Sequence, residues 1–122
     1  MTRILIIDND IFFLEVIQDL LKTHGFQVIG AKNGGLGLEL AESQTPDLII
    51  SDINMPEIDG YEVLKALRKK SVTQNIPVIL ITGGGTDSVY LRARELGANA
   101  CLAKPCSIQD LIQAIEAQIK KQ

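Results

Sequence analysis

Five polar residues stand at or just after the ends of short apolar runs, and their side chains can bind metal ions or phosphoryl groups. Asp8 and Asn9 follow the first run, Asp52 the second, Thr82 the third and Lys104 the fourth. Carboxyl and carbonyl oxygens suit a hard cation that keeps several waters, such as Mg²⁺. A lysine and a hydroxyl suit a phosphoryl group, whose oxygens need cationic and hydrogen-bonding partners.

Asp52 is the residue on which such chemistry would act. A carboxylate can attack a phosphoryl donor and form an acyl phosphate. A metal ion and a lysine would neutralise the charge that builds up during the transfer. A single aspartate after a strand is more often an ordinary loop residue, so this interpretation depends on whether the four runs end at one place.

The stretch around Asp52 predicts a buried strand followed by a loop. Leu48 to Ile50 is an apolar run between turn signals, which is typical of a strand buried on both faces. The loop after Asp52 holds Pro56 and the turn pair Asp59-Gly60. In open parallel sheets, ligands bind in the crevice beyond the carboxyl ends of the strands. Asp52 therefore lies where a ligand would bind.

The whole chain alternates five times between strand and helix patterns. Strands are expected at Ile4–Ile7, Phe26–Ala31, Leu48–Ile50, Pro77–Thr82 and Ala100–Ala103, and helices at about Ile11–His24, Leu36–Ser43, Gly60–Lys70, Thr86–Leu96 and Ile108–Ile119. This alternation predicts an α/β fold, with a parallel sheet between helices and right-handed crossovers. Because the carboxyl ends of parallel strands share one edge, the polar residues should meet there.

Local signals set the helix boundaries. Asp10 is expected to cap the first helix, and either Thr86 or Asp87 the fourth. Ser107 with Asp110 resembles a capping box before the last helix. The triplet Asn33-Gly34-Gly35 is expected to break the chain before the second helix.

Composition limits the class of protein. A chain of 122 residues is one domain, and 46% hydrophobic residues with a mean hydropathy of +0.17 fit strands buried on both faces. The net charge of −3, a pI near 5.1 and the lack of a Lys/Arg run argue against nucleic-acid binding. No signal peptide or membrane-length apolar run is present, so no membrane association is expected. The two cysteines, Cys101 and Cys106, suggest the reduced cytoplasm.

Over essentially its whole length, the chain with its polar strand-end residues resembles the receiver domains of bacterial two-component response regulators. The matching segments are Ile4–Asp8, Asp52-Ile53-Asn54-Met55-Pro56 with Asp59-Gly60, Thr82, and Lys104-Pro105. The chain is similar to single-domain chemotaxis regulators, and the resemblance implies a flavodoxin-like three-layer sandwich with five parallel strands in the order 2-1-3-4-5 and five helices. It implies one receiver domain over residues 1–122 without an output domain, and a cis Lys104–Pro105 bond.

The resemblance also implies a role for each site residue. Asp52 would accept a phosphoryl group from a phosphohistidine on a sensor histidine kinase or a phosphotransfer protein. Mg²⁺ would be held by the pocket of Asp8, Asn9, Asp52 and the Asn54 backbone carbonyl. Thr82 and Lys104 would contact the bound phosphoryl group. Such a protein is a signalling domain rather than an enzyme, since it catalyses only its own phosphoryl transfer and dephosphorylation, and it acts through a separate downstream protein or in a phosphorelay.

Three positions depart from the family pattern. Asn9 stands where a second acid is usual, which should weaken Mg²⁺ binding. Cys101 stands where an aromatic switch residue is usual, so the signal should pass by another route. Gly84 stands two residues after Thr82, where larger polar side chains are common.

Two alternatives stay open. Asn9 and Cys101 favour a degenerate receiver, a binding module whose Asp52 is never phosphorylated, while the intact Asp52, Thr82 and Lys104 favour the phosphoacceptor. A flavin-binding electron carrier of the same fold would need a hydroxyl-rich phosphate loop after the first strand. The acidic Asp8-Asn9-Asp10 would repel a phosphate there.

The first helix predicts a docking surface. Its inward face should hold five apolar residues at helical spacing, Phe13, Val16, Ile17, Leu20 and Leu21. Ile11 to Leu14 are four apolar residues in succession, so they cannot all face inward. Phe12 or Leu14 should therefore be exposed beside the site, where a partner could bind.

Overall fold

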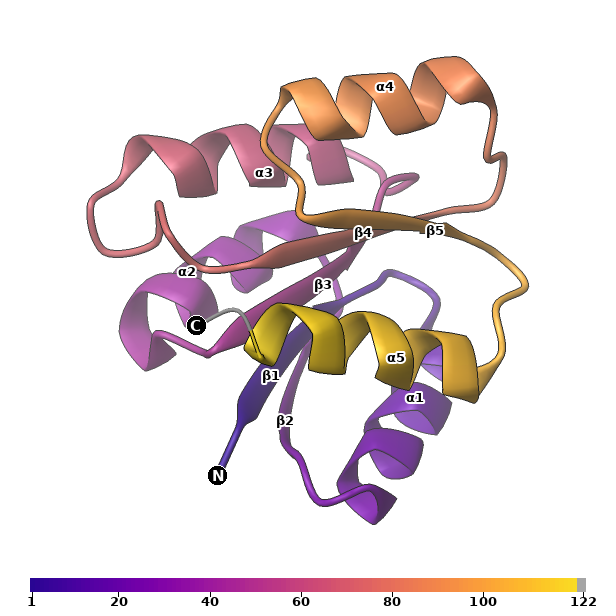
Figure 1. The fold of residues 1–122 in the computed structure, drawn as a ribbon. Coiled ribbons are helices and arrows are strands. Elements are labelled where there is room, and N and C mark those ends of the chain that lie inside the picture. The colour runs from indigo at the N-terminus through magenta and orange to yellow at the C-terminus, as the bar shows by residue number, and fades with distance from the viewer. Residues whose placement is uncertain (121–122) are drawn as a thin grey trace.

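The computed structural model describes residues 1–120 and shows five strands alternating with five helices (Figure 1). The elements are β1 (Arg3–Ile7), α1 (Ile11–Thr23), β2 (Gln27–Ala31), α2 (Gly34–Gln44), β3 (Leu48–Asp52), α3 (Gly60–Lys69), β4 (Val78–Thr82), α4 (Asp87–Glu95), β5 (Ala100–Ala103) and α5 (Ile108–Ile119).

All strands are parallel, in the order β2-β1-β3-β4-β5, which confirms the predicted fold class and strand order. The register aligns the strand ends. Ile7 pairs with Ser51, so Asp8 and Asp52 are each one residue further along neighbouring strands. Thr82 pairs with Ala103, so Lys104 is one residue beyond Thr82. The sheet itself therefore brings the candidate residues to one edge.

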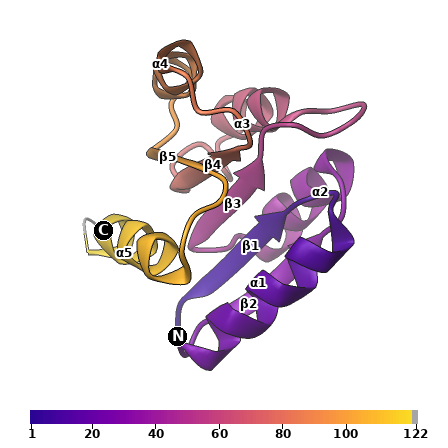
Figure 2. The same ribbon diagram turned by 90° about the vertical axis from the view of Figure 1, so that its right-hand side faces the viewer.

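Helices cover both faces of the sheet and create two apolar cores. In Figures 1 and 2, α2, α3 and α4 lie on one side of the sheet, and α1 and α5 on the other. Leu5 and Ile7 of β1 belong to the first core, while Ile4 and Ile6 belong to the second. Every residue of β3 and β4 is buried. This double burial explains the continuous apolar runs of the sequence.

Side chains cap every helix at its N-terminus. The caps accept a backbone N–H two or three residues into the helix, and they are Asp10, Asn33, Asp59, Thr86 and Ser107. Such caps typically contribute about 0.5–2 kcal/mol each. Thr86, not Asp87, caps α4. The prediction for α2 was wrong at its start, since Asn33 caps the helix and the two following glycines form its first turn.

Helix α1 buries a narrower stripe than its sequence predicts. Leu14, Ile17 and Leu21 are buried, whereas Val16 and Leu20 are exposed, contrary to expectation. These three buried residues repeat at spacings of three and four, which is one side of a helix. Phe13 is half-buried, and Phe12 is 77% exposed. No helix within residues 1–120 is long and apolar enough to cross a bilayer.

Candidate functional site

Two carboxylates and one ammonium group meet at the carboxyl edge of the sheet. The Nζ of Lys104 lies 3.1 Å from Oδ2 of Asp8 and 3.7 Å from Oδ2 of Asp52. The Asp8 and Asp52 residues are 1% and 7% exposed. The lysine side chain is 26% exposed, so solvent reaches the site from its side. The structure therefore brings together three of the residues singled out in the sequence.

The loop after β1 orients Asp8. Its backbone N–H donates to the carbonyl of Ala31 at 3.0 Å, which extends the pairing of β1 with β2. Its Oδ1 accepts the backbone N–H of Asp10 at 2.9 Å, leaving Oδ2 for Lys104. Asp10 accepts from Phe13 as the cap of α1, as predicted.

Gly60 lets helix α3 begin directly beside the end of β3. Its N–H donates to the Ile53 carbonyl at 2.9 Å. A Cβ at this position would overlap the Asp52 carbonyl oxygen and stand 2.7 Å from Ile53 Cα. Any larger residue would therefore push α3 away from the strand that carries Asp52. Asp59 and Glu62 complete the start of α3 with a capping box.

Electrostatics make Asp52 harder to ionise than an ordinary aspartate. Burial is the main cause that raises the pKa of Asp52, and the charge of Asp8 adds to it. The Lys104 charge and the backbone N–H groups of Asn54 and Ile53 act in the opposite direction. Two carboxylates face one ammonium group, so the pocket carries more negative charge than Lys104 neutralises when both are ionised, and it then favours a further cation.

The donor set fits Mg²⁺. Asp8 and Asp52 offer hard carboxylate oxygens, and Asn54 follows on the adjoining loop with a backbone carbonyl. Across residues 1–120, no group of three or more His, Cys, Asp or Glu residues is arranged to hold a metal. A site with two carboxylates suits a cation that keeps several waters. Asn9 is exposed and its side chain makes no hydrogen bond to another described residue.

Thr82 lies beside this cluster with its hydroxyl oxygen already engaged. The residue is 2% exposed, and its Oγ1 accepts the N–H of Gly84 at 3.1 Å. The Thr82 carbonyl accepts the backbone N–H of Lys104 at 2.7 Å, which fixes the lysine backbone next to β4. The Lys104–Pro105 bond is cis, as the resemblance implied.

Phe13 is a neighbour of the site that the sequence did not reveal. The Lys104 Nζ lies 4.2 Å from the centre of the Phe13 ring. This cation–π contact holds the lysine from the α1 side while the carboxylates hold it from the sheet. The sequence pattern identified Phe13 only as an inward residue of the helix, because nothing local links it to residue 104.

A pocket of about 520 Å³ opens next to Asn54 and Thr82, between α3 and α4. Arg92 of α4 reaches over the ring of Tyr61 of α3, with its Cζ 4.2 Å from the ring centre. Ser88 lines the same pocket one helical turn earlier. No local signal in the sequence indicates this pocket, because its wall joins residues of α3, β4 and α4.

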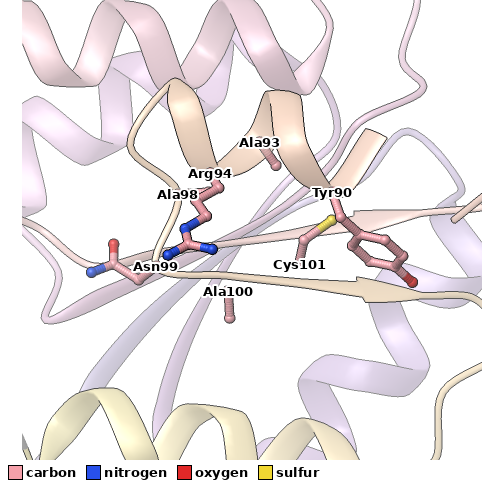
Figure 3. Close-up of a pocket in the computed structure, with 7 residues that line it drawn as sticks. All are labelled: Tyr90, Ala93, Arg94, Ala98, Asn99, Ala100 and Cys101. Atoms are coloured by element: carbon pink, nitrogen blue, oxygen red, sulfur yellow. The ribbon is translucent and has the colours of Figure 1, made fainter. Parts of the chain in front are cut away.

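Cys101 faces α4 rather than the site edge. It is half-buried on β5, and Figure 3 shows it next to the Tyr90 side chain. With Arg94 these residues line a smaller pocket of about 280 Å³. Burial raises the pKa of the Cys101 thiol, which disfavours a reactive thiolate. It therefore acts as a small apolar side chain.

Comparisons with known proteins match this geometry. The family model of the response regulator receiver domain covers residues 4–116. Protein PilH of Pseudomonas aeruginosa is 35% identical over 117 residues, which span 96% of this chain and 97% of PilH. The transcriptional regulatory protein CpxR homolog of Haemophilus influenzae is 36% identical over 99% of this chain, which spans 52% of that protein. The solved structure of the chemotaxis protein CheY4 of Vibrio cholerae superposes with a TM-score of 0.91 at 28% identity, covering 96% of this chain and 98% of that one.

Proposed function

The chain belongs to the response regulator receiver domain family, and from that premise we propose that Asp52 accepts a phosphoryl group from a phosphohistidine on a sensor histidine kinase or a phosphotransfer protein. The observation that carries the proposal is the cluster at the sheet edge. Lys104 bridges Asp8 and Asp52 there, at 3.1 and 3.7 Å. The arrangement combines a nucleophile, an acidic partner and a cation in one place.

Each residue has a definite task in the proposed transfer. The ionised Asp52 oxygen attacks phosphorus, and the phosphorus–nitrogen bond of the donor breaks with its electrons going to the imidazole. Lys104 pairs with the negative oxygens of the arriving phosphoryl group. Asp8, Asp52 and the Asn54 carbonyl would hold Mg²⁺, which neutralises charge on the transferring group when it is bound.

Thr82 connects the proposed phosphorylation to α4. The Thr82 hydroxyl lies at the same edge of the sheet as Asp52, and its oxygen accepts the backbone N–H of Gly84. Turning toward a phosphoryl oxygen would release that N–H and allow the loop of residues 83–85 to move. A Cβ at Gly85 would overlap the hydroxyl of Tyr90, so this loop and α4 are in close contact. We propose that the loop and α4 shift together, without the aromatic side chain that Cys101 replaces.

The receiver would signal through a separate protein in the cytoplasm. Support comes from PilH, of which this chain covers 97%. The two free cysteines are also consistent with a reducing compartment. The exposed Phe12 on α1 beside the site is the proposed contact for the phosphodonor.

The competing function is a degenerate receiver that binds partners without phosphorylation. The observation that favours it is Asn9, an uncharged and exposed residue beside the pocket. A degenerate receiver would have the same fold and the same docking surfaces, but Asp52 would form no covalent bond to a phosphoryl group.

Phosphoryl transfer from a phosphorylated histidine phosphotransfer domain would separate the two functions. We expect Mg²⁺-dependent labelling of the wild-type protein and none of Asp52→Asn. Asp59→Asn is the matched control, since asparagine also caps helices and the change removes one carboxylate nearby. Labelling of Asp52→Asn at the wild-type rate would reject Asp52 as the acceptor.

A further inference from the structure

Phe13 completes a cycle of contacts that begins and ends at Asp8. The carboxylate of Asp8 accepts the backbone N–H of Asp10 through Oδ1, at 2.9 Å. Asp10 in turn accepts the backbone N–H of Phe13 at 3.2 Å, as the cap of α1. The Phe13 ring faces the Lys104 Nζ, which lies 4.2 Å from the ring centre and donates to Oδ2 of Asp8 at 3.1 Å. The cycle therefore joins the first turn of α1 to the proposed reactive edge of the sheet.

Three groups surround the ammonium of Lys104, which has three N–H bonds to direct at them. Two are the carboxylates of Asp8 and Asp52, at 3.1 and 3.7 Å, and the third is the Phe13 ring. The face of an aromatic ring attracts a cation through its quadrupole. The ring thus fixes the ammonium from a direction in which neither carboxylate lies.

Lys104 depends on such contacts because its backbone and its ammonium are held separately. The backbone N–H donates to the Thr82 carbonyl at 2.7 Å, so the base of the side chain is fixed. A flexible stem then carries the ammonium, and the side chain is 26% exposed. The Phe13 ring, by contrast, is half-buried and packs against the apolar core between α1, α5 and the sheet. An anchored ring can therefore restrict a flexible cation.

We propose that Phe13 is a positioning residue for the phosphorylation of Asp52, and that it acts through Lys104. Its ring holds the ammonium at the pocket before the donor arrives, so the cation need not be ordered during the reaction. Without the ring, the lysine stem turns more often toward solvent on its exposed side. The inference deepens the proposed function and rests on it.

NMR of the unphosphorylated protein tests the contact itself. Phe13→Leu removes the aromatic face but keeps a large apolar side chain in the core. The Cε protons of Lys104 are next to Nζ, so the ring current of Phe13 should move their signals upfield of those of the exposed lysines. We expect Phe13→Leu to abolish this upfield shift and Phe13→Tyr to retain it.

The role in the reaction is measured as the second-order rate of phosphorylation by phosphoramidate at saturating Mg²⁺. An Asp52 oxygen bonds to phosphorus while the phosphorus–nitrogen bond breaks, and the bonding electrons leave with the protonated nitrogen as neutral ammonia. We expect Phe13→Leu to lower this rate roughly two- to fivefold, the range that corresponds to a partly exposed cation–π contact. Phe13→Tyr should restore the rate, because it keeps the ring face.

Phe26→Leu is the matched control. Phe26 also packs its ring against the same apolar core, but it precedes β2 and so lies at the opposite edge of the sheet from Lys104. This change should leave both the rate and the Lys104 signals as in the wild-type protein.

An upfield shift that persists in Phe13→Leu, or an unchanged rate in that variant, would overturn the proposal. An equal fall in Phe26→Leu would also overturn it, because lost core packing would then explain the effect. If the wild-type protein is not phosphorylated at all, the proposed function is wrong and the positioning role falls with it, although the NMR shift would still report the contact.

Discussion

Replacing Lys104 with glutamine removes the cation that bridges the two buried carboxylates. Asp8 and Asp52 stay in place, each less than a tenth exposed, and now face each other without a positive charge between them. Glutamine can still donate a hydrogen bond, so the main loss is charge. We expect Lys104→Gln to lower the free energy of unfolding at neutral pH.

The structure sets the size of this effect. At separations of 3.1 and 3.7 Å, each attraction is worth roughly 1–5 kcal/mol for an effective dielectric constant of about 20–80. The lysine is 26% exposed and loses its own hydration in the pair, which offsets part of that attraction. The expected net loss is about 1–3 kcal/mol at low Mg²⁺.

The pH dependence of the loss identifies its cause. The folded-state pKa of Asp52 is already raised, and removal of Lys104 takes away a cause that lowers it. A carboxyl whose folded-state pKa is raised destabilises the fold above that pKa, and the destabilisation disappears as pH falls through it. Urea unfolding should therefore show a larger difference between variant and wild type near pH 7.5 than near pH 4.5.

A surface lysine provides the control. Lys70 pairs with Glu42 in an exposed position, so Lys70→Gln should change the free energy of unfolding by less than about 1 kcal/mol. Saturating Mg²⁺ should restore part of the loss in Lys104→Gln, because a bound cation again neutralises the carboxylates. A loss of equal size at both pH values would refute the electrostatic reasoning.

Three further substitutions test separate parts of the site. Asn9→Asp adds a carboxylate beside Asp8 and should tighten Mg²⁺ binding by roughly 10–100-fold in calorimetry, and equal affinities would place residue 9 outside the metal site. Phe12→Ala truncates a side chain that is 77% exposed, so it should slow transfer from the cognate histidine donor but leave phosphoramidate rates unchanged, and equal slowing of both would exclude docking at α1. Gly84→Arg should lengthen the half-life of the aspartyl phosphate, because the new side chain would shield it from water, and an unchanged half-life would argue against shielding.

Much of the fold could be predicted because its signals are local. A strand buried on both faces must be apolar throughout, and such runs preceded Asp8, Asp52 and Thr82. The alternation with helices then fixed a parallel sheet, and parallel strands deliver their ends to one edge. The sequence therefore predicted that Lys104 and the two carboxylates meet at this edge, whereas the ion pairs between them became visible only in the structure.

The contacts that the sequence did not reveal join distant segments. The stacking of Arg92 on Tyr61 depends on how α3 and α4 lie beside each other, and no local pattern encodes that distance. The start of α2 was missed because two glycines after Asn33 suggested a break, although the asparagine side chain supplies the cap that holds them in a helix. The exposure of Val16 likewise depends on how narrowly α1 meets the sheet.

The most direct test of the account is to locate the phosphoryl group. The protein would be phosphorylated with phosphoramidate and Mg²⁺, reduced with borohydride, which converts an aspartyl phosphate into homoserine, digested, and mapped by mass spectrometry. We predict homoserine at position 52 and an intact aspartate at positions 8, 10 and 59. An unmodified Asp52, or homoserine at any of the other positions instead, would contradict the claim that Asp52 is the phosphoacceptor.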